Sequence, residues 1–111
     1  MITARLVGRL GGGMEQTPLV GGPYAGTVTL HTVTVPAGET WVCAITGAAS
    51  GDPSYRSYRI TFGGKDLSTS SGVHTYRYAV VLAGGTTTTL EKSGSADVTV
   101  DLVVHTATLD V

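Results

Sequence analysis

A chain of 111 residues is long enough for one domain with a hydrophobic core and too short for two. Its formal net charge of −1 argues against a general electrostatic grip on nucleic acid or on an anionic membrane surface. Only 14% of the residues are charged, fewer than is typical of soluble domains. We therefore expect other subunits to cover part of the surface.

The single cysteine, Cys43, cannot form an internal disulfide. It shares a strand face with apolar neighbours, which favours a buried and unreactive thiol. No apolar run approaches the length of a membrane span, and the N-terminal residues lack the pattern of a signal peptide. We expect no membrane partner, and assembly into a particle is one route by which such a protein leaves a cell.

The first 25 residues have a weak structural pattern. Residues 2–9 alternate and can form a short strand, whereas residues 10–25 are rich in glycine and show no clear period. We predict that residues 1–25 form an arm that docks on a neighbouring subunit, the alternative being a disordered tail. The apolar side of the short strand consists of Ile2, Ala4 and Leu6. The apolar anchors of the arm are Leu19, Val20 and Tyr24.

The remaining residues, 26–111, are expected to form the folded domain. Its first two strands, 27–35 and 40–48, flank Pro36 and Gly38, which suit the loop of a tight β-hairpin. The apolar residues change phase within the first of these strands, near His31 and Thr32. That change predicts a β-bulge.

Further runs of alternating residues follow, separated by loops rich in glycine, serine and proline. No segment has helical periodicity. We therefore predict an all-β protein, a single antiparallel β-sandwich of jelly-roll type with about six to eight strands. The expected later strands are residues 55–62, 73–82, 86–91 and 97–109, and residues 63–72 are expected to form a turn and a loop.

The usual catalytic and cofactor motifs are absent from the sequence. It has no G-x-S-x-G motif, no phosphate-binding loop and no dinucleotide fingerprint, and one cysteine cannot build a cysteine-based zinc site. The histidines at positions 31, 74 and 105 share no ligand spacing. A histidine repeated around a trimer axis could bind a metal, but no residue pattern supports such a site. We predict a protein that is not an enzyme and carries no cofactor.

Tyrosine and arginine gather in residues 55–62 and 73–82. If these two strands pair, the side chains concentrate on one region of a sheet, and both residue types are enriched in protein interfaces. Tyr58, Tyr76 and Tyr78 are in phase with apolar residues and are expected in the core. The remaining candidates for an outer contact are Tyr55, Arg56, Arg59 and Arg77.

Residues 32–41, with the sequence TVTVPAGETW, resemble the VTVPAGxTW element of small β-sandwich domains in bacteriophage tail fibres, minor tail proteins and head decorations. Residues 82–90 and 93–100 are similar to the AGxTxTL and GSxDVTV segments of the same domains. The resemblance covers about residues 27–105. It implies a virion structural protein with a jelly-roll-like domain, often trimeric, which is attached to the particle through an arm and has no catalytic residues.

Two functions follow as expectations. The first is a non-enzymatic phage virion structural protein, a minor tail or capsid decoration component that forms a homo-oligomer, preferably a trimer, and docks on other virion proteins. The alternative is a carbohydrate- or receptor-binding module at a fibre or tail tip. It would bind a host surface glycan through aromatic and arginine side chains near residues 49–54 and 63–72. Nucleic acid is the least expected partner.

Overall fold

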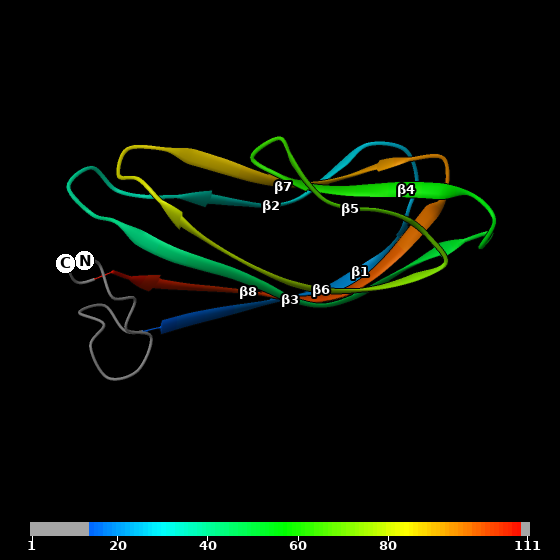
Figure 1. Ribbon diagram of the computed structural model, residues 1–111, viewed down its shortest axis with the longest axis horizontal. Helices are drawn as coiled ribbons and strands as arrows, with labels where there is room; N and C mark the ends of the chain where they lie inside the picture. The colour runs from blue at the N-terminus through cyan, green and yellow to red at the C-terminus, as the bar shows by residue number, and fades with distance from the viewer. Residues whose placement is uncertain (1–13, 110–111) are drawn as a thin grey trace.

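The computed structural model describes residues 14–109, which form two antiparallel sheets packed face to face (Figure 1). The predicted antiparallel β-sandwich is confirmed. Within these residues no helix is long and apolar enough to cross a membrane. The strands are β1 (Met14–Tyr24), β2 (Val28–Thr34), β3 (Trp41–Asp52), β4 (Ser57–Phe62), β5 (Lys65–Ser71), β6 (Val73–Leu82), β7 (Thr87–Gly94) and β8 (Asp97–Thr108).

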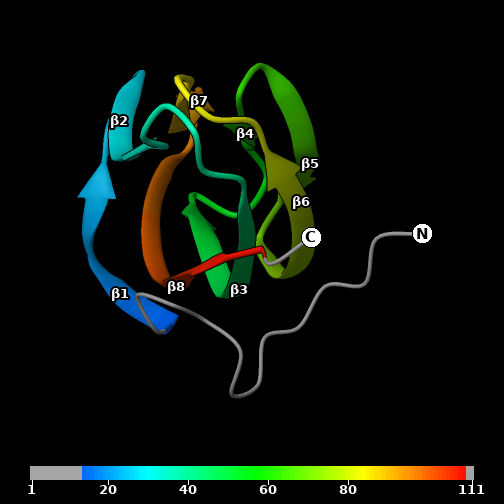
Figure 2. The ribbon, with the colours of Figure 1, turned by 90° about the vertical axis from the view of Figure 1, so that its left-hand side faces the viewer.

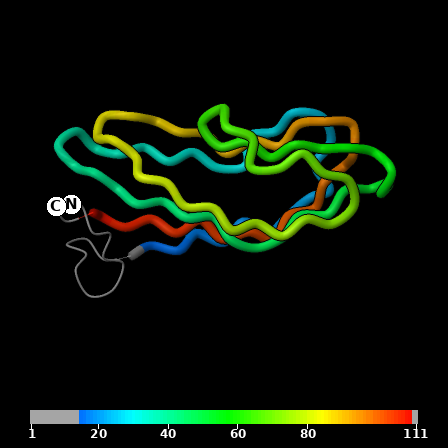
Figure 3. The backbone as a smooth tube through the Cα atoms, viewed as in Figure 1, coloured from blue at the N-terminus to red at the C-terminus, as the bar shows by residue number. Residues whose placement is uncertain are grey.

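The strand order is that of a double-sheet jelly roll. Sheet A has the order β1-β8-β3-β6, and sheet B has the order β2-β7-β4-β5. Only the connection from β4 to β5 stays within one sheet, and every other connection crosses between the layers, as the tube in Figure 3 shows. Figure 2 shows β1 and β6 at opposite edges of the sandwich. The edges of sheet B are β2 and β5.

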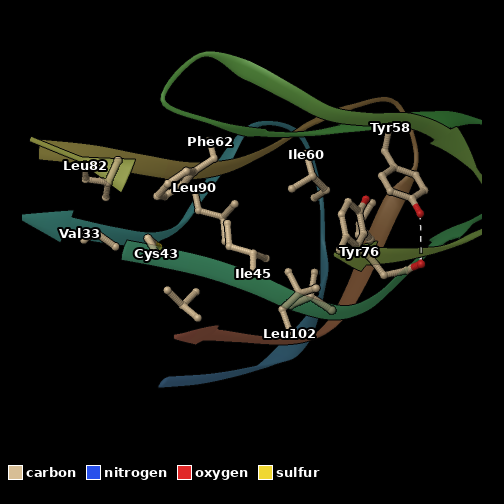
Figure 4. Close-up of a cluster of buried hydrophobic side chains, with 14 of the residues drawn as sticks. Val33, Cys43, Ile45, Tyr58, Ile60, Phe62, Tyr76, Leu82, Leu90 and Leu102 are labelled. Carbon is tan, nitrogen blue, oxygen red and sulfur yellow. Dashed lines mark hydrogen bonds between the residues drawn. The ribbon is translucent and has the colours of Figure 1, made fainter. Parts of the chain in front are cut away.

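Alternation within each strand places one set of side chains between the sheets. In β8, Val98, Val100 and Leu102 are buried, while the intervening residues Thr99 and Asp101 are exposed. The core also contains polar groups with partners. Tyr58 Oη lies 3.1 Å from the carbonyl oxygens of both Ala49 and Gly72 and donates its one hydrogen between them. The dashed line in Figure 4 marks one of these contacts. The core contains, among others, the buried residues Val33, Cys43, Ile45, Ile60, Phe62, Tyr76, Leu90, Leu102 and Val104.

The predicted hairpin between residues 27–35 and 40–48 is wrong, although its turn is correct. The amide of Glu39 donates to the carbonyl oxygen of Pro36 at 3.2 Å, and Gly38 has a positive φ of 88°. The strands on either side lie in different sheets, because β2 pairs with β7 and β3 pairs with β6 and β8. The turn therefore carries the chain from one layer to the other.

The structure also differs from the predicted N-terminal arm. Residues Met14–Tyr24 form β1, which pairs with β8 of the same chain from Met14 to Tyr24. Leu19 and Tyr24 pack against the core of their own chain, so they are not free anchors for a neighbour. The sequence of this segment has no strand-like alternation, but β8 lies beside it and provides hydrogen-bond partners for its backbone. The short strand expected at residues 2–9 lies outside the described residues.

The structure confirms the predicted bulge in β2 but not the predicted loop within residues 63–72. The predicted bulge in the first sandwich strand is confirmed, because the register between β2 and β7 shifts between Thr29 and His31. The serine- and threonine-rich loop predicted within residues 63–72 is instead the strand β5, which pairs with β4 across the Gly63-Gly64 turn. Its residues are mostly polar because β5 is an edge strand with little core to cover.

Lys92 is the one buried charged side chain within residues 14–109, and the alternation of β7 does not mark it in the sequence. Its ammonium group donates to the carbonyl oxygens of Gly26 at 2.7 Å and Gly94 at 3.3 Å. Burial lowers the pKa of Lys92, and the nearby carboxylate of Asp97 partly opposes that shift. The lysine thereby joins the β1–β2 connection to the end of β7.

Candidate interaction surface

The outer faces of the two sheets differ in chemistry. On sheet B, the residues that point away from the core are almost all hydroxylic or charged, as is usual for the solvent side of an antiparallel sheet. This outer face includes Thr29, Thr32 and Thr34 of β2, Ser57, Arg59 and Thr61 of β4, and Thr87, Thr89 and Glu91 of β7.

The outer face of sheet A is mainly apolar. Strand pairing arranges its side chains in cross-strand rows, in which alanine, valine and threonine predominate. The rows are Thr99, Ser50 and Val73; Val20, Asp101, Ala48 and Thr75; Pro18, Val103, Thr46 and Arg77; Gln16, His105, Ala44 and Ala79; and Ala107, Val42 and Val81. We call this set the apolar face.

Exposure shows that much of the apolar face is open to solvent in the single chain, although Val42 and Ala107 in its last row are buried. Val20 is 74% exposed, Val73 is 73% exposed and Val81 is 54% exposed. Among the described residues, the other exposed large hydrophobic side chain is Tyr55, which lies away from this face. Single exposed apolar residues are common on proteins, but a set gathered on one sheet face is typical of an interaction site.

Two open hollows make the apolar face uneven. One has a volume of about 190 Å³ and lies beside Ala48, Val73 and Thr99. The other has a volume of about 450 Å³ and includes Arg77 and Val103 in its lining. The first hollow lies toward the end of sheet A at which β6 begins, and the second lies nearer the middle of the sheet. Both leave room for side chains of a partner.

Few charges interrupt the apolar face. Arg77 of β6 and Asp101 of β8 lie on either side of β3, one row apart. Within residues 14–109 the ion pair of the chain is Arg59 with Asp66, at 3.5 Å, on the outer face of sheet B. The apolar face also carries His105, whose Nε2 lies 3.0 Å from Thr46 Oγ1. One cation and one anion on an otherwise neutral face suit pairing with a complementary surface.

The predicted tyrosine–arginine cluster is not a single site. Its strands belong to different sheets, since β4 lies in sheet B and β6 in sheet A. Arg77 therefore lies on the apolar face, whereas Arg59 lies on the opposite outer face. The alternation within each strand predicts which face is buried, but it contains no information about which strand is its neighbour.

Tyr55 and Arg56 form a separate small feature in the connection between β3 and β4. Tyr55 is 78% exposed, and the Arg56 guanidinium carbon lies 5.9 Å from the centre of the Tyr55 ring. That distance suits a cation–π contact. Of the expected arm anchors, only Val20 faces outward, and it lies on the apolar face.

The sequence carried a signal for the apolar face that alternation alone does not capture. Residues 41–49, with the sequence WVCAITGAA, and residues 79–83, with the sequence AVVLA, are apolar in both phases. A strand covered on both faces reads as a nearly continuous apolar run. In this chain both runs lie in sheet A, so the second apolar phase points outward.

The groups that could carry chemistry are dispersed. The three histidines lie in β2, β6 and β8. Residues 14–109 contain no group of three or more histidine, cysteine, aspartate or glutamate residues close enough to hold a metal ion. Cys43 is fully buried, and desolvation raises its pKa from 9.0 to about 11.

No protein-family model matches the chain, and no curated protein sequence matches it. Solved structures are similar in fold. Infectious bursal disease virus of the Gx strain matches with a TM-score of 0.55 and 11% identity, over 86% of this chain and 32% of the viral chain. The VP2 subviral particle of the same virus matches with a TM-score of 0.53 and 9% identity, over 86% and 32%.

A third structure, of Bacillus endospore appendages described as disulfide-linked pili, has a TM-score of 0.48 and 10% identity, over 87% of this chain and 88% of that chain. The present chain spans about a third of the length of the two viral chains. At this level of identity the likeness to the viral chains shows the fold. The chain is a jelly-roll β-sandwich of a kind also found in virus particles.

Proposed function

We propose that the protein is a non-enzymatic structural component of a bacteriophage particle, a minor tail or capsid decoration protein that acts by self-association and by docking on other virion proteins. The single observation that carries the proposal is the apolar face of sheet A. Its exposed valines and sparse charges contrast with the polar outer face of sheet B in the same molecule. The likeness to viral particle chains supports the fold that the proposal requires.

The burial of apolar surface supports self-association as the mode of action. Removing apolar surface from water contributes about 25 cal/mol per Å². Interface cores are depleted in charge relative to the rest of a protein surface. The apolar face meets both conditions across all four strands of its sheet, whereas sheet B presents hydroxyl and charged groups that gain little from being covered.

Light scattering tests this proposal on the full 11.3 kDa chain. We expect a native mass several times that of one chain. The double variant Val20→Glu with Thr99→Glu places two carboxylates on the apolar face, at exposed positions of β1 and β8, and should reduce the mass to that of a monomer. The matched control is Thr32→Glu with Ser71→Glu, at exposed positions on sheet B. A monomeric wild type, or equal loss in the control, would contradict self-association through this face.

A second candidate function rests on Tyr55 and Arg56. An exposed aromatic ring held beside an arginine can stack on a sugar ring, which fits a carbohydrate-binding module at a fibre or tail tip. Screening the chain and its Tyr55→Ala variant against host cell-wall glycans tests this function. Binding that disappears in the variant would favour it, and absence of binding in the wild type would remove it.

A further inference from the structure

The β6 edge of sheet A lacks the protection that the other three sheet edges have. β1 contains Pro18, and its register with β8 shifts between Gly21 and Tyr24. β2 contains a bulge after Thr29. β5 begins at Lys65 and has a register shift of its own against β4. Prolines, bulges and lysines are the usual means by which edge strands avoid pairing with other chains.

β6 has none of these features. It runs from Val73 to Leu82 without proline, glycine or lysine, and its register with β3 is unbroken over the whole length. Within residues 14–109 no strand pairs with its other side. β5 contacts β6 through side chains, where Ser68 Oγ donates to Tyr76 Oη at 2.8 Å, but it lies in the other sheet and does not pair with β6. The backbone groups on the open side of β6 are therefore available to a further strand.

Two core-facing side chains beyond Tyr76 are incompletely covered. Tyr78 and Val80 point in the same direction as the buried residues Tyr76 and Leu82, yet they are only half-buried. Tyr78 contacts the ring of Phe62 edge-on, with the ring centres 6.5 Å apart. An added strand with apolar residues at every second position would complete this end of the core.

The part of the chain before β1 has the sequence that such a strand requires. Residues 2–6 carry Ile2, Ala4 and Leu6 in one phase, with Thr3 and Arg5 in the other, and three glycines at residues 11–13 link this segment to β1. We propose that residues 2–9 of one copy add to the β6 edge of a second copy as an antiparallel strand, with Ile2, Ala4 and Leu6 over Tyr78 and Val80. This assignment rests on the proposed self-association and names its connector.

Geometry favours a second copy over the same chain as the source of this strand. β6 runs toward the end of sheet A at which β1 begins, since Leu82, Trp41 and Thr108 share a row next to that of Met14. An antiparallel strand on β6 would run away from that end. It would finish some 20–30 Å from Met14, whereas residues 10–13, which link residue 9 to Met14, span at most about 18 Å. Every strand pair in residues 14–109 is antiparallel.

The test uses the full chain and a fluorescein-labelled peptide of residues 1–13. We expect saturable binding by anisotropy and, at excess peptide, a fall in the native mass of the assembly. The same peptide with N-methyl groups at alternate backbone positions keeps its side chains but cannot pair on a strand edge, and should bind at least tenfold more weakly. The variant Val80→Lys places a charge on the core side of the β6 edge and should also lose binding. Val28→Lys, at a half-buried position of the β2 edge, is the matched control.

The outcomes separate this inference from the proposed function. Equal binding of the plain and N-methylated peptides overturns strand addition. If the chain forms an oligomer but binds no peptide, residues 2–9 do not connect the copies, and the proposed self-association is still supported. A monomeric chain that binds no peptide overturns both. If circular dichroism shows that Val80→Lys does not fold, the comparison of the plain and N-methylated peptides on the wild-type chain still tests strand addition.

Discussion

Ser68 of β5 and Tyr76 of β6 join the two sheets through a hydrogen bond of 2.8 Å at the edge of the sandwich. Tyr76 is buried, and desolvation raises its pKa although the Ser68 hydroxyl opposes the shift. The bond holds the β5 edge of sheet B against the β6 edge of sheet A.

Removing the bond between Ser68 and Tyr76 should weaken the contact between β5 and β6. We expect Ser68→Ala to lower the free energy of unfolding by about 1 kcal/mol, because the Tyr76 hydroxyl loses a partner in a site with little water. Chemical denaturation monitored by Trp41 fluorescence measures the change. Ser71→Ala, at an exposed position of the same strand, is the control and should stay within about 0.5 kcal/mol of the wild type. Equal effects would show that the bond contributes nothing.

Gly47 of β3 lies in the lining of the second hollow of the apolar face. Its φ is +120°, and an added Cβ would collide with the carbonyl oxygen of Asp101 in β8. Gly64 also has a positive φ, of 82°, but a Cβ there meets no atom within 4 Å. We expect Gly64→Ala to cost about 1 kcal/mol through its backbone conformation and Gly47→Ala about 1–3 kcal/mol more through the collision. Thermal unfolding of both variants provides the comparison.

Lys92 should contribute to stability despite its burial. Lys92→Met leaves the carbonyl oxygens of Gly26 and Gly94 without their ammonium partner, and we expect a loss of about 1–3 kcal/mol in the free energy of unfolding. Lys65→Met, at an exposed position of β5, is the control. A Lys92→Met variant more stable than the wild type would mean that the cost of burying the charge exceeds the worth of its hydrogen bonds.

Burial of Cys43 predicts a loss of stability at alkaline pH. The thiol ionises near pH 9.0 in the unfolded chain and near pH 11 in the folded protein, so between these values the unfolded state binds fewer protons. Stability attributable to the thiol is therefore complete below pH 9 and falls as the pH rises toward 11, by roughly 2–3 kcal/mol in total. The difference in unfolding free energy between the wild type and Cys43→Ala should shrink over this range. A constant difference would contradict the raised pKa.

The sequence predicted the local properties of the strands. The alternation of Tyr58, Ile60 and Phe62 placed all three in the core, and the change of phase near His31 marked a bulge that the structure contains. Both features depend on neighbours within a few residues. The jelly-roll type followed from the number of such strands and the absence of helical periodicity.

The partner of each strand could not be read in the same way. The turn at Pro36 and Gly38 has the same chemistry whether it closes a hairpin or crosses between sheets, and only long-range pairing decides between them. For this reason Arg59 and Arg77 were expected together and lie on opposite faces. Alternation also does not predict the apolar face, because it identifies one buried face of β3 and takes no account of the apolar residues in the other phase of that strand.

The most direct test of the account is hydroxyl-radical footprinting of the full chain in dilute and in concentrated solution. It reports the solvent exposure of individual side chains. The account predicts that labelling of Val20, Val73 and Val81 falls severalfold on concentration, while labelling of Tyr55 does not change. Valines that remain as reactive in the concentrated as in the dilute sample would contradict the claim that the apolar face of sheet A is covered when the protein assembles.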